Sequence, residues 1–182
     1  MSVLRMVAYV ALLLAAVTGL SACSSAAPQL DTLTHAEPDS TRQRATRRLS
    51  LASAYYEQNQ NDVALQEVRA ALQIDPSYSD AYSLLGLIHQ RDKASLLAQQ
   101  SFEQAIVLAS KPPVRAAELA AIQHNYGWFL CEQNRFAEAQ AQFDLALAQP
   151  SYRQADKTHQ AIALCKARAS LSTDARQRPS TQ

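Results

Sequence analysis

Small and apolar side chains recur along this chain at a constant offset of 34 in the numbering. The matched positions are Leu51 with Leu85, Ala52 with Gly86, Ala64 with Ala98, Val68 with Phe102, Ala71 with Ala105, and Leu72 with Ile106. Within each copy the apolar positions follow helical spacing. The pattern predicts repeated pairs of helices that bury their apolar faces by stacking on one another.

A third copy follows at a longer interval. Its positions match the second copy at a constant offset of 41, so seven residues have been added around Pro112 and Pro113. These positions are Gly127, Ala139, Phe143, Ala146 and Leu147. Because proline is tolerated at the start of a helix, we expect one lengthened helix from Pro113 to Glu132.

A period of 34 between successive helix pairs is typical of the tetratricopeptide repeat. We therefore predict an all-α fold, a tetratricopeptide-repeat right-handed superhelix of about three and a half helix pairs. The repeats are expected near 45–78, 79–112 and 120–153 within a domain over 45–170. A helix over 154–169 has no second helix after it and is expected to cap the array.

Small residues are needed where the two helices of a pair meet almost backbone to backbone. We expect this role for Ala52, Gly86 and Gly127 on the first helices, and for Ala64, Ala98 and Ala139 on the second. Val68, Phe102 and Phe143 are expected to fill the seam between repeats, with Ala71, Ala105 and Ala146 leaving room for the next helix.

The segment over 1–22 is typical of a secretory signal peptide. Arg5 precedes an apolar run over 7–17 that is too short to span a bilayer. The motif Leu20-Ser21-Ala22-Cys23 resembles a bacterial lipobox, which implies that Cys23 is lipidated and becomes the mature N-terminus. Two or three acyl chains suffice for stable anchoring. The alternative is an ordinary secretory signal with a free cysteine near its cleavage site.

The residues after Cys23 suggest where the protein is anchored. Ser24, in place of the Asp that favours retention at the inner membrane in lipoproteins with this motif, points to the periplasmic face of the outer membrane. Residues 23–44 are rich in Ser, Ala, Thr and Pro and predict a flexible tether, with folding expected to begin near Thr41. Residues 171–182 are expected to form a disordered tail.

Composition and charge agree with a helical array and exclude a nucleic-acid partner. Of all residues 48% are apolar and only three are glycine. Removing residues 1–22 leaves 16 basic against 16 acidic residues, which is no footprint for nucleic acid. A basic cluster at the start of the first helix either forms a solvated helix face or contacts lipid phosphates. It consists of Arg42, Arg44, Arg47 and Arg48.

Two cysteines remain after Cys23, in a compartment where disulfides persist. Cys131 and Cys165 are separated by the same offset of 34, at the same position of consecutive first helices. Stacking can therefore bring their Cα atoms within the roughly 7 Å that a disulfide allows. The competing hypothesis is a metal site that adds His124 and His159. Helix geometry argues against it, because His124 and Cys131 lie about 10 Å apart along the helix axis.

No catalytic motif is visible. The chain has no Gly-rich phosphate loop, nucleophile elbow or HExxH pair, and its polar stretch from Asn59 to Asp62 predicts a turn between two helices. We expect a protein that is not an enzyme, with no catalytic residue, metal or cofactor.

The segment Asn125-Tyr126-Gly127-Trp128-Phe129-Leu130-Cys131, with Ala163-Leu164-Cys165 one repeat later, resembles the PilF/PilW-type lipoproteins, the pilotins of type IV pili. The resemblance implies that Cys131 and Cys165 are a disulfide pair. It also implies an outer-membrane lipoprotein that helps the secretin reach the outer membrane or assemble there, and so supports twitching motility.

A protein partner, with the secretin as first candidate, is expected on the concave face of the first helices. The residues predicted to line this groove are Leu49, Ser53, Tyr56, Leu87, Gln90, Arg91, His124, Trp128 and Ile162. Tyr56 and Trp128 are the expected anchors, with packing of Trp128 against the next repeat as an equal alternative. The alternative function is a general periplasmic repeat scaffold for envelope assembly.

Overall fold

The computed structural model describes residues 40–177, with side chains up to residue 173. The predicted signal peptide, Cys23, most of the predicted tether and residues 178–182 lie outside the described residues. The helices are α2 (Thr41–Glu57), α3 (Asn61–Ile74), α4 (Ser79–Arg91), α5 (Ser95–Ala109), α6 (Ala116–Glu132), α7 (Phe136–Leu147) and α8 (Ala155–Gln177). No strand occurs between residues 40 and 177.

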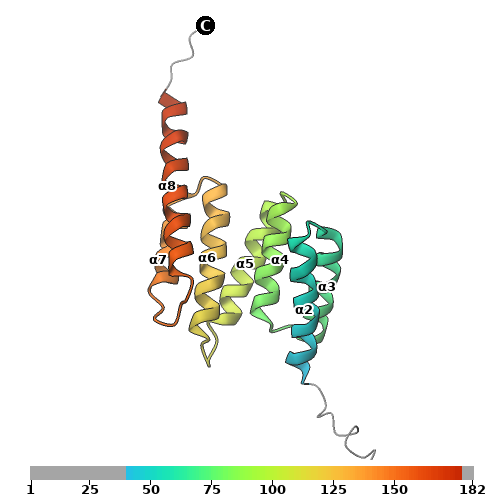
Figure 1. Ribbon diagram of the computed structural model, residues 1–182. Helices are drawn as coiled ribbons and strands as arrows, with labels where there is room; N and C mark the ends of the chain where they lie inside the picture. Colours follow the sequence, from blue (N-terminus) through green and yellow to red (C-terminus); the bar gives the residue numbers. More distant parts are fainter. Residues whose placement is uncertain (1–39, 178–182) are drawn as a thin grey trace, which may run out of the picture. The chain divides into compact units, whose positions relative to one another are not determined.

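The helices form consecutive pairs that stack side by side (Figure 1). α2 packs on α3, α4 on α5 and α6 on α7, while α8 packs on both α6 and α7. The first helices α2, α4, α6 and α8 also contact one another in turn. This arrangement is the predicted all-α tetratricopeptide-repeat fold. None of the described helices is long and apolar enough to cross a bilayer.

Each helix pair is joined by a turn of the same backbone geometry. Asn59, Lys93 and Asn134 have left-handed φ angles of 60°, 60° and 61°. The N–H of the residue after each of them donates to the carbonyl five residues earlier, at 2.9 Å in all three turns. This is the Schellman end of a helix. The turn therefore recurs at offsets of 34 and 41 residues, as the apolar pattern does.

The close approach of the paired helices depends on their small residues. A Cβ added to Gly86 would lie 2.8 Å from the ring of Phe102, and one added to Gly127 would lie 2.8 Å from the ring of Phe143. Both rings are fully buried, as are the partner alanines Ala64, Ala98 and Ala139. In the first repeat Ala52 takes the place of the glycine, and the seam residue is the smaller Val68.

The inserted residues lie mostly in the connection between α5 and α6 and do not form a longer helix. α6 begins at Ala116, so the predicted start at Pro113 is wrong, and residues 110–115 connect α5 to α6 through a cis Pro112-Pro113 bond. Arg115 is the N-cap residue, and Glu118 in the first turn pairs with it at 2.9 Å. A carboxylate in the first turn of a helix favours this start because it faces the positive end of the helix dipole.

α2 begins at Thr41, where the sequence predicts the start of folding, but both ends of the repeat domain differ from the predicted domain bounds of 45 and 170. Ser40 caps α2 in a capping box with Gln43, so residues 41–44 are helical although the sequence predicts a tether up to residue 44. α8 continues to Gln177, past the predicted end of the cap at 169. The sequence explains this extension, because no Gly or Pro occurs between Pro150 and Pro179.

Candidate protein-binding groove

The face formed by α2, α4 and α6 carries two adjoining hollows. The aliphatic hollow has a volume of about 220 Å³ and is lined by Leu49, Ser53, Asp80, Ser83, Leu84, Leu87, Ala121, Ile122 and Asn125. The aromatic hollow has a volume of about 260 Å³ and is lined by Tyr56, Leu87, Gln90, Arg91, Trp128 and Glu132. Leu87 lines both hollows, so they adjoin at this side chain, and we refer to the two together as the groove.

The aliphatic hollow contains one carboxylate. Burial, together with the nearby charge of Glu118, raises the pKa of Asp80 to about 6, against the opposing charges of Arg115 and Arg42. Beside it, Asn125 Nδ2 donates a hydrogen bond of 3.2 Å to Ser83 Oγ. The hollow therefore offers aliphatic surface with a few polar groups, the usual character of a binding pocket.

The aromatic hollow is held by contacts between neighbouring repeats. The Arg91 guanidinium lies 3.5 Å from the centroid of the Tyr56 ring and donates to the Tyr56 carbonyl oxygen and to Asn59 Oδ1. Gln90 Nε2 donates a hydrogen bond of 2.8 Å to Glu132 Oε2, while Gln90 Oε1 is buried without a partner.

Trp128 has both of the roles that the sequence predicts as alternatives. It is partly buried against the core cluster that contains Phe102 and Phe129, and it also lines the aromatic hollow. Tyr126 and Phe129 are buried in that core, at 6% and 1% exposure. The indole is therefore positioned by the core while part of it faces the groove.

Two predicted groove residues lie outside both hollows. His124 Nδ1 lies 2.8 Å from Thr158 Oγ1 of α8, and burial, with the charge of Lys157, lowers the pKa of His124. Ile162 of α8 packs on the core cluster around Phe143. The side chain of His124 thus contacts α8, and neither residue lines the hollows formed by α2, α4 and α6.

Sequence reasoning missed part of the lining. Asp80, Ser83, Leu84, Ala121, Ile122, Asn125 and Glu132 line the groove but were not predicted. Helical spacing could have found some of them, since Ser83 lies four residues before Leu87 and Asn125 lies three before Trp128, one turn away on the same face.

The structure joins Cys131 of α6 to Cys165 of α8 by a disulfide. Their Cα atoms are 5.8 Å apart, and both residues are buried. His124 contacts Thr158, and His159 is exposed. Among the described residues no group of His, Cys, Asp or Glu is arranged to hold a metal ion.

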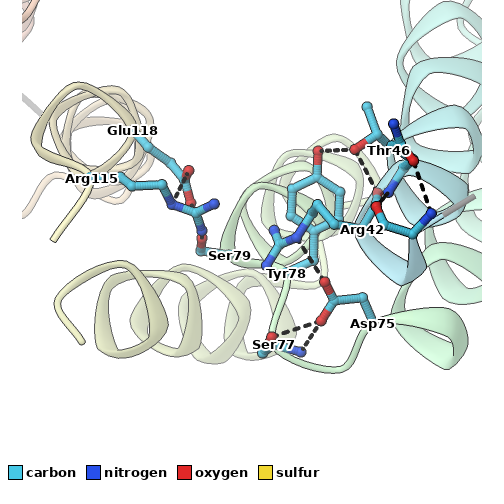
Figure 2. Close-up of polar contacts among 10 residues, drawn as sticks. Arg42, Thr46, Asp75, Ser77, Tyr78, Ser79, Arg115 and Glu118 are labelled. Carbon is cyan, nitrogen blue, oxygen red and sulfur yellow. Dashed lines mark hydrogen bonds and ion pairs between the residues drawn. The ribbon is translucent and has the colours of Figure 1, made fainter. Parts of the chain in front are cut away.

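The basic cluster of α2 is partly paired within the repeat domain. Arg42 Nε lies 2.8 Å from Asp75 Oδ2 (Figure 2), and Arg48 Nη1 lies 3.0 Å from Glu67 Oε2. Ser77 fixes the same Asp75 through its N–H and its hydroxyl. Although burial alone would raise the pKa of Asp75, the hydrogen bonds from Ser77 and the charges of Arg42 and Arg115 lower it below its usual value.

Comparison with known proteins gives consistent matches. A model of the TPR repeat matches residues 52–93. An uncharacterised protein of Haemophilus influenzae is 34% identical over 121 residues, covering 66% of this chain and 64% of that protein. The type IV pilus assembly protein PilF of Pseudomonas aeruginosa is 32% identical over 91 residues, covering 50% of this chain and 33% of PilF.

Solved structures extend these matches to the fold. The crystal structure of PilW, described as a widely conserved type IV pilus biogenesis factor, superposes with a TM-score of 0.62 at 34% identity, covering 71% of this chain and 56% of PilW. The structure of P. aeruginosa PilF gives the same TM-score of 0.62 at 26% identity, covering 70% of this chain and 55% of PilF. The chain spans less than two thirds of each of these relatives.

The helix pairs, the repeat model and the superpositions define the class: the chain is an all-α tetratricopeptide-repeat protein. Within that class it is similar to PilF and PilW in sequence and in fold, which confirms the resemblance seen from Asn125 to Cys131 and at Cys165.

Proposed function

We propose that this protein is an outer-membrane lipoprotein scaffold for type IV pilus biogenesis, acting as a pilotin that binds the secretin. It promotes localisation or multimerisation of the secretin from the periplasmic face of the membrane, where acyl chains on Cys23 anchor it. The likeness to PilF and PilW, which are described by their roles in the type IV pilus, carries this proposal.

The groove supplies the binding surface in this proposal. A segment of the secretin lies along α2, α4 and α6, with an apolar side chain in the aliphatic hollow and a second contact on Tyr56 and Trp128. Aromatic side chains with a polar end are enriched among the residues that dominate binding energy. No catalytic group takes part, and the protein acts by holding its partner.

Deletion of the gene tests the role in the cell. Secretin multimers should be lost from the outer membrane or fall sharply, and twitching motility should fail, both restored by the intact gene. Replacing Cys23 by Ala should leave the protein soluble in the periplasm and reduce the multimers. Normal secretin multimers in the deletion strain would remove the pilotin proposal and favour the general envelope scaffold.

Substitutions in the groove test the binding face. Tyr56→Ala and Trp128→Ala should each weaken secretin binding by about tenfold or more, because truncating a central aromatic anchor costs on the order of 2 kcal/mol. Leu96→Ala is the matched control, since Leu96 is 71% exposed on α5 and lines neither hollow. Circular dichroism checks that Trp128→Ala remains folded. Unchanged affinity in both groove variants would place the partner on another face.

A further inference from the structure

A third hollow, which we call the basic hollow, has no part in the proposed groove. It has a volume of about 390 Å³ and is lined by Arg42, Ser77, Leu108, Ala109, Lys111, Pro112, Pro113 and Arg115. It shares no lining residue with the aliphatic or the aromatic hollow. Its volume lies within the range of roughly 300–1,000 Å³ that is usual for small-ligand sites.

The charged side chains that line the basic hollow are all cationic. Arg42 comes from α2, whereas Lys111 and Arg115 come from the connection between α5 and α6 that holds the inserted residues. No carboxylate lines the hollow. The insertion thus adds two positive charges and two prolines to a site whose third charge already belongs to the first repeat.

Arg42 is fixed in place before any ligand arrives. Figure 2 shows its guanidinium between the carboxylate of Asp75, 2.8 Å away, and the ring of Tyr78, whose centroid is 4.1 Å away. Its Nη1 is buried and has no hydrogen-bond partner. The Arg42 side chain as a whole is 34% exposed and lines the hollow, so an anionic oxygen can reach the accessible part of this side chain.

Arg115 and Lys111 complete the cationic lining in different ways. Arg115 is fixed by two contacts to Glu118, of 2.9 and 3.0 Å, beside the N-terminus of α6, which has no side-chain cap. Within residues 40–177 the Lys111 ammonium makes no ion pair or hydrogen bond, so its charge is not offset, whereas Asp75 and Glu118 offset those of the two arginines.

The remaining wall of the basic hollow is apolar. Leu108, Ala109, Pro112 and Pro113 present carbon surface beside the three cations. An inorganic anion would leave that surface unused, while an anion with a short carbon group would cover it. Guanidinium groups match the geometry of phosphate oxygens, and ammonium groups bind phosphate as point charges.

We propose that the basic hollow binds a phosphate ester with a short carbon group, such as a glyceryl group. Arg42, Lys111 and Arg115 hold the phosphate oxygens, and the glyceryl carbons lie against Leu108 and the two prolines. This chemistry comes from two sources, the headgroup of an anionic phospholipid such as phosphatidylglycerol, or a soluble glycerol phosphate. The proposal is independent of the secretin and of the groove.

Titration of the purified chain tests this assignment. Isothermal calorimetry and amide NMR are recorded with dihexanoyl-phosphatidylglycerol below its micelle concentration, with sn-glycerol 3-phosphate, and with N-acetylalanine as a carboxylate probe. At least one phosphate compound should bind and shift the amide signals of residues 108–117. Lys111→Gln should weaken that binding by about tenfold, the effect of losing one charge-assisted hydrogen bond.

The control is Lys166→Gln, which removes the same charge from an exposed position of α8 and should leave the affinity unchanged. Binding of the lipid alone identifies a headgroup site, and comparable binding of glycerol phosphate identifies a soluble ligand. The proposal is overturned if neither phosphate compound binds, if Lys111→Gln binds as tightly as the unaltered chain, or if N-acetylalanine binds as well as the phosphates.

Discussion

Each turn inside a helix pair places one residue in the left-handed region of φ and ψ. The three turns use different residue types at this position. Asn59 and Asn134 belong to the residue type that tolerates this conformation, whereas Lys93 does not. Left-handed backbone costs an ordinary residue roughly 1–2 kcal/mol. The backbone conformation of Lys93 therefore lowers the stability of the folded state. Its exposed side chain lines none of the three hollows.

Lys93→Gly should raise the free energy of unfolding by about 0.5–1 kcal/mol, because glycine removes the backbone cost but loses more entropy on folding. Asn59→Gly is the matched control at the equivalent turn and should change stability by a few tenths of a kcal/mol at most. Urea denaturation followed by circular dichroism measures both. A loss of stability in Lys93→Gly would show that the side chain matters more than the backbone at this turn.

Asp80 makes the stability of the domain depend on pH. Burial and the charge of Glu118 raise its pKa from 3.8 to about 6. The folded state therefore binds more protons than the unfolded state in this range, and stability falls as the pH rises from about 4 to about 6. Asp80→Asn removes this dependence and should raise the free energy of unfolding at pH 7.5 by on the order of 1–3 kcal/mol.

Urea denaturation at pH 5.0 and pH 7.5 measures the free energy of unfolding of the unaltered protein and of Asp80→Asn. The gain from Asp80→Asn should be larger at the higher pH, because there the folded chain of the unaltered protein must hold the ionised carboxylate. An equal effect at both pH values would mean that Asp80 is solvated in the folded state.

The residues of the core could be predicted from the sequence better than those of the groove. Val68, Phe102 and Phe143 recur with the repeat because each fills the same seam, so their periodicity reports their burial. Asp80 does not recur as the same residue type in the other repeats. A groove residue is not required to pack against the neighbouring repeat, so its identity need not follow the repeat. His124 lies at the predicted position of its helix, but its side chain contacts Thr158 of α8. The sequence pattern of one helix does not reveal such a contact with the next.

At the scale of the helix pair, the size of a side chain on the first helix is matched to the size of its partner on the second. Gly86 faces Phe102 and Gly127 faces Phe143, whereas the equivalent residues of the first repeat, Ala52 and Val68, lie in one buried cluster. The larger seam residue thus occurs where the first helix has no Cβ. Overpacking a dense core costs about 1–3 kcal/mol, because the displaced ring has no free volume to enter.

Gly86→Ala should therefore destabilise the domain by about 1–3 kcal/mol, in spite of the better helix propensity of alanine. Phe102→Val should cost about 2–4 kcal/mol through the cavity it leaves. The double variant reproduces the Ala52 and Val68 pair of the first repeat, so its loss should be smaller than the sum of the single losses by about 1–2 kcal/mol. Chemical denaturation of all four proteins completes the cycle, and strict additivity would contradict the matching of sizes.

Helix boundaries could be predicted only where local signals agree with packing. The turn after Tyr56 is predicted by its polar residues and lies there. Proline suits a first turn and so predicts that α6 starts at Pro113, yet α6 starts at Ala116, where the ion pair of Arg115 with Glu118 favours the first turn. The end of α8 lacks a glycine or proline signal before residue 178, and composition alone suggests a tail where the chain remains helical.

In the whole molecule, each repeat is stabilised only by its neighbours, as in other linear arrays. α8 contacts α6 and α7 and has no helix beyond it among the described residues. Several of its apolar side chains are exposed, including Leu164 at 61% and Leu171 at 69%. The disulfide between Cys131 and Cys165 is the covalent connection that holds this last helix to the array.

Replacing both cysteines by alanine should lower the free energy of unfolding by about 3–4 kcal/mol, the chain-entropy value for a loop of this length. The loss should be local at first: amide hydrogen exchange should speed up in α8 while α2 and α3 keep their protection, because an array transmits a defect only through successive interfaces. A reducing agent should produce the same change in the unaltered protein and none in the alanine variant, which separates the disulfide from the packing of the two side chains. Uniform loss of protection from α2 to α8 would instead mean that the repeats unfold as one unit, so that the bond secures the entire array and not its last helix.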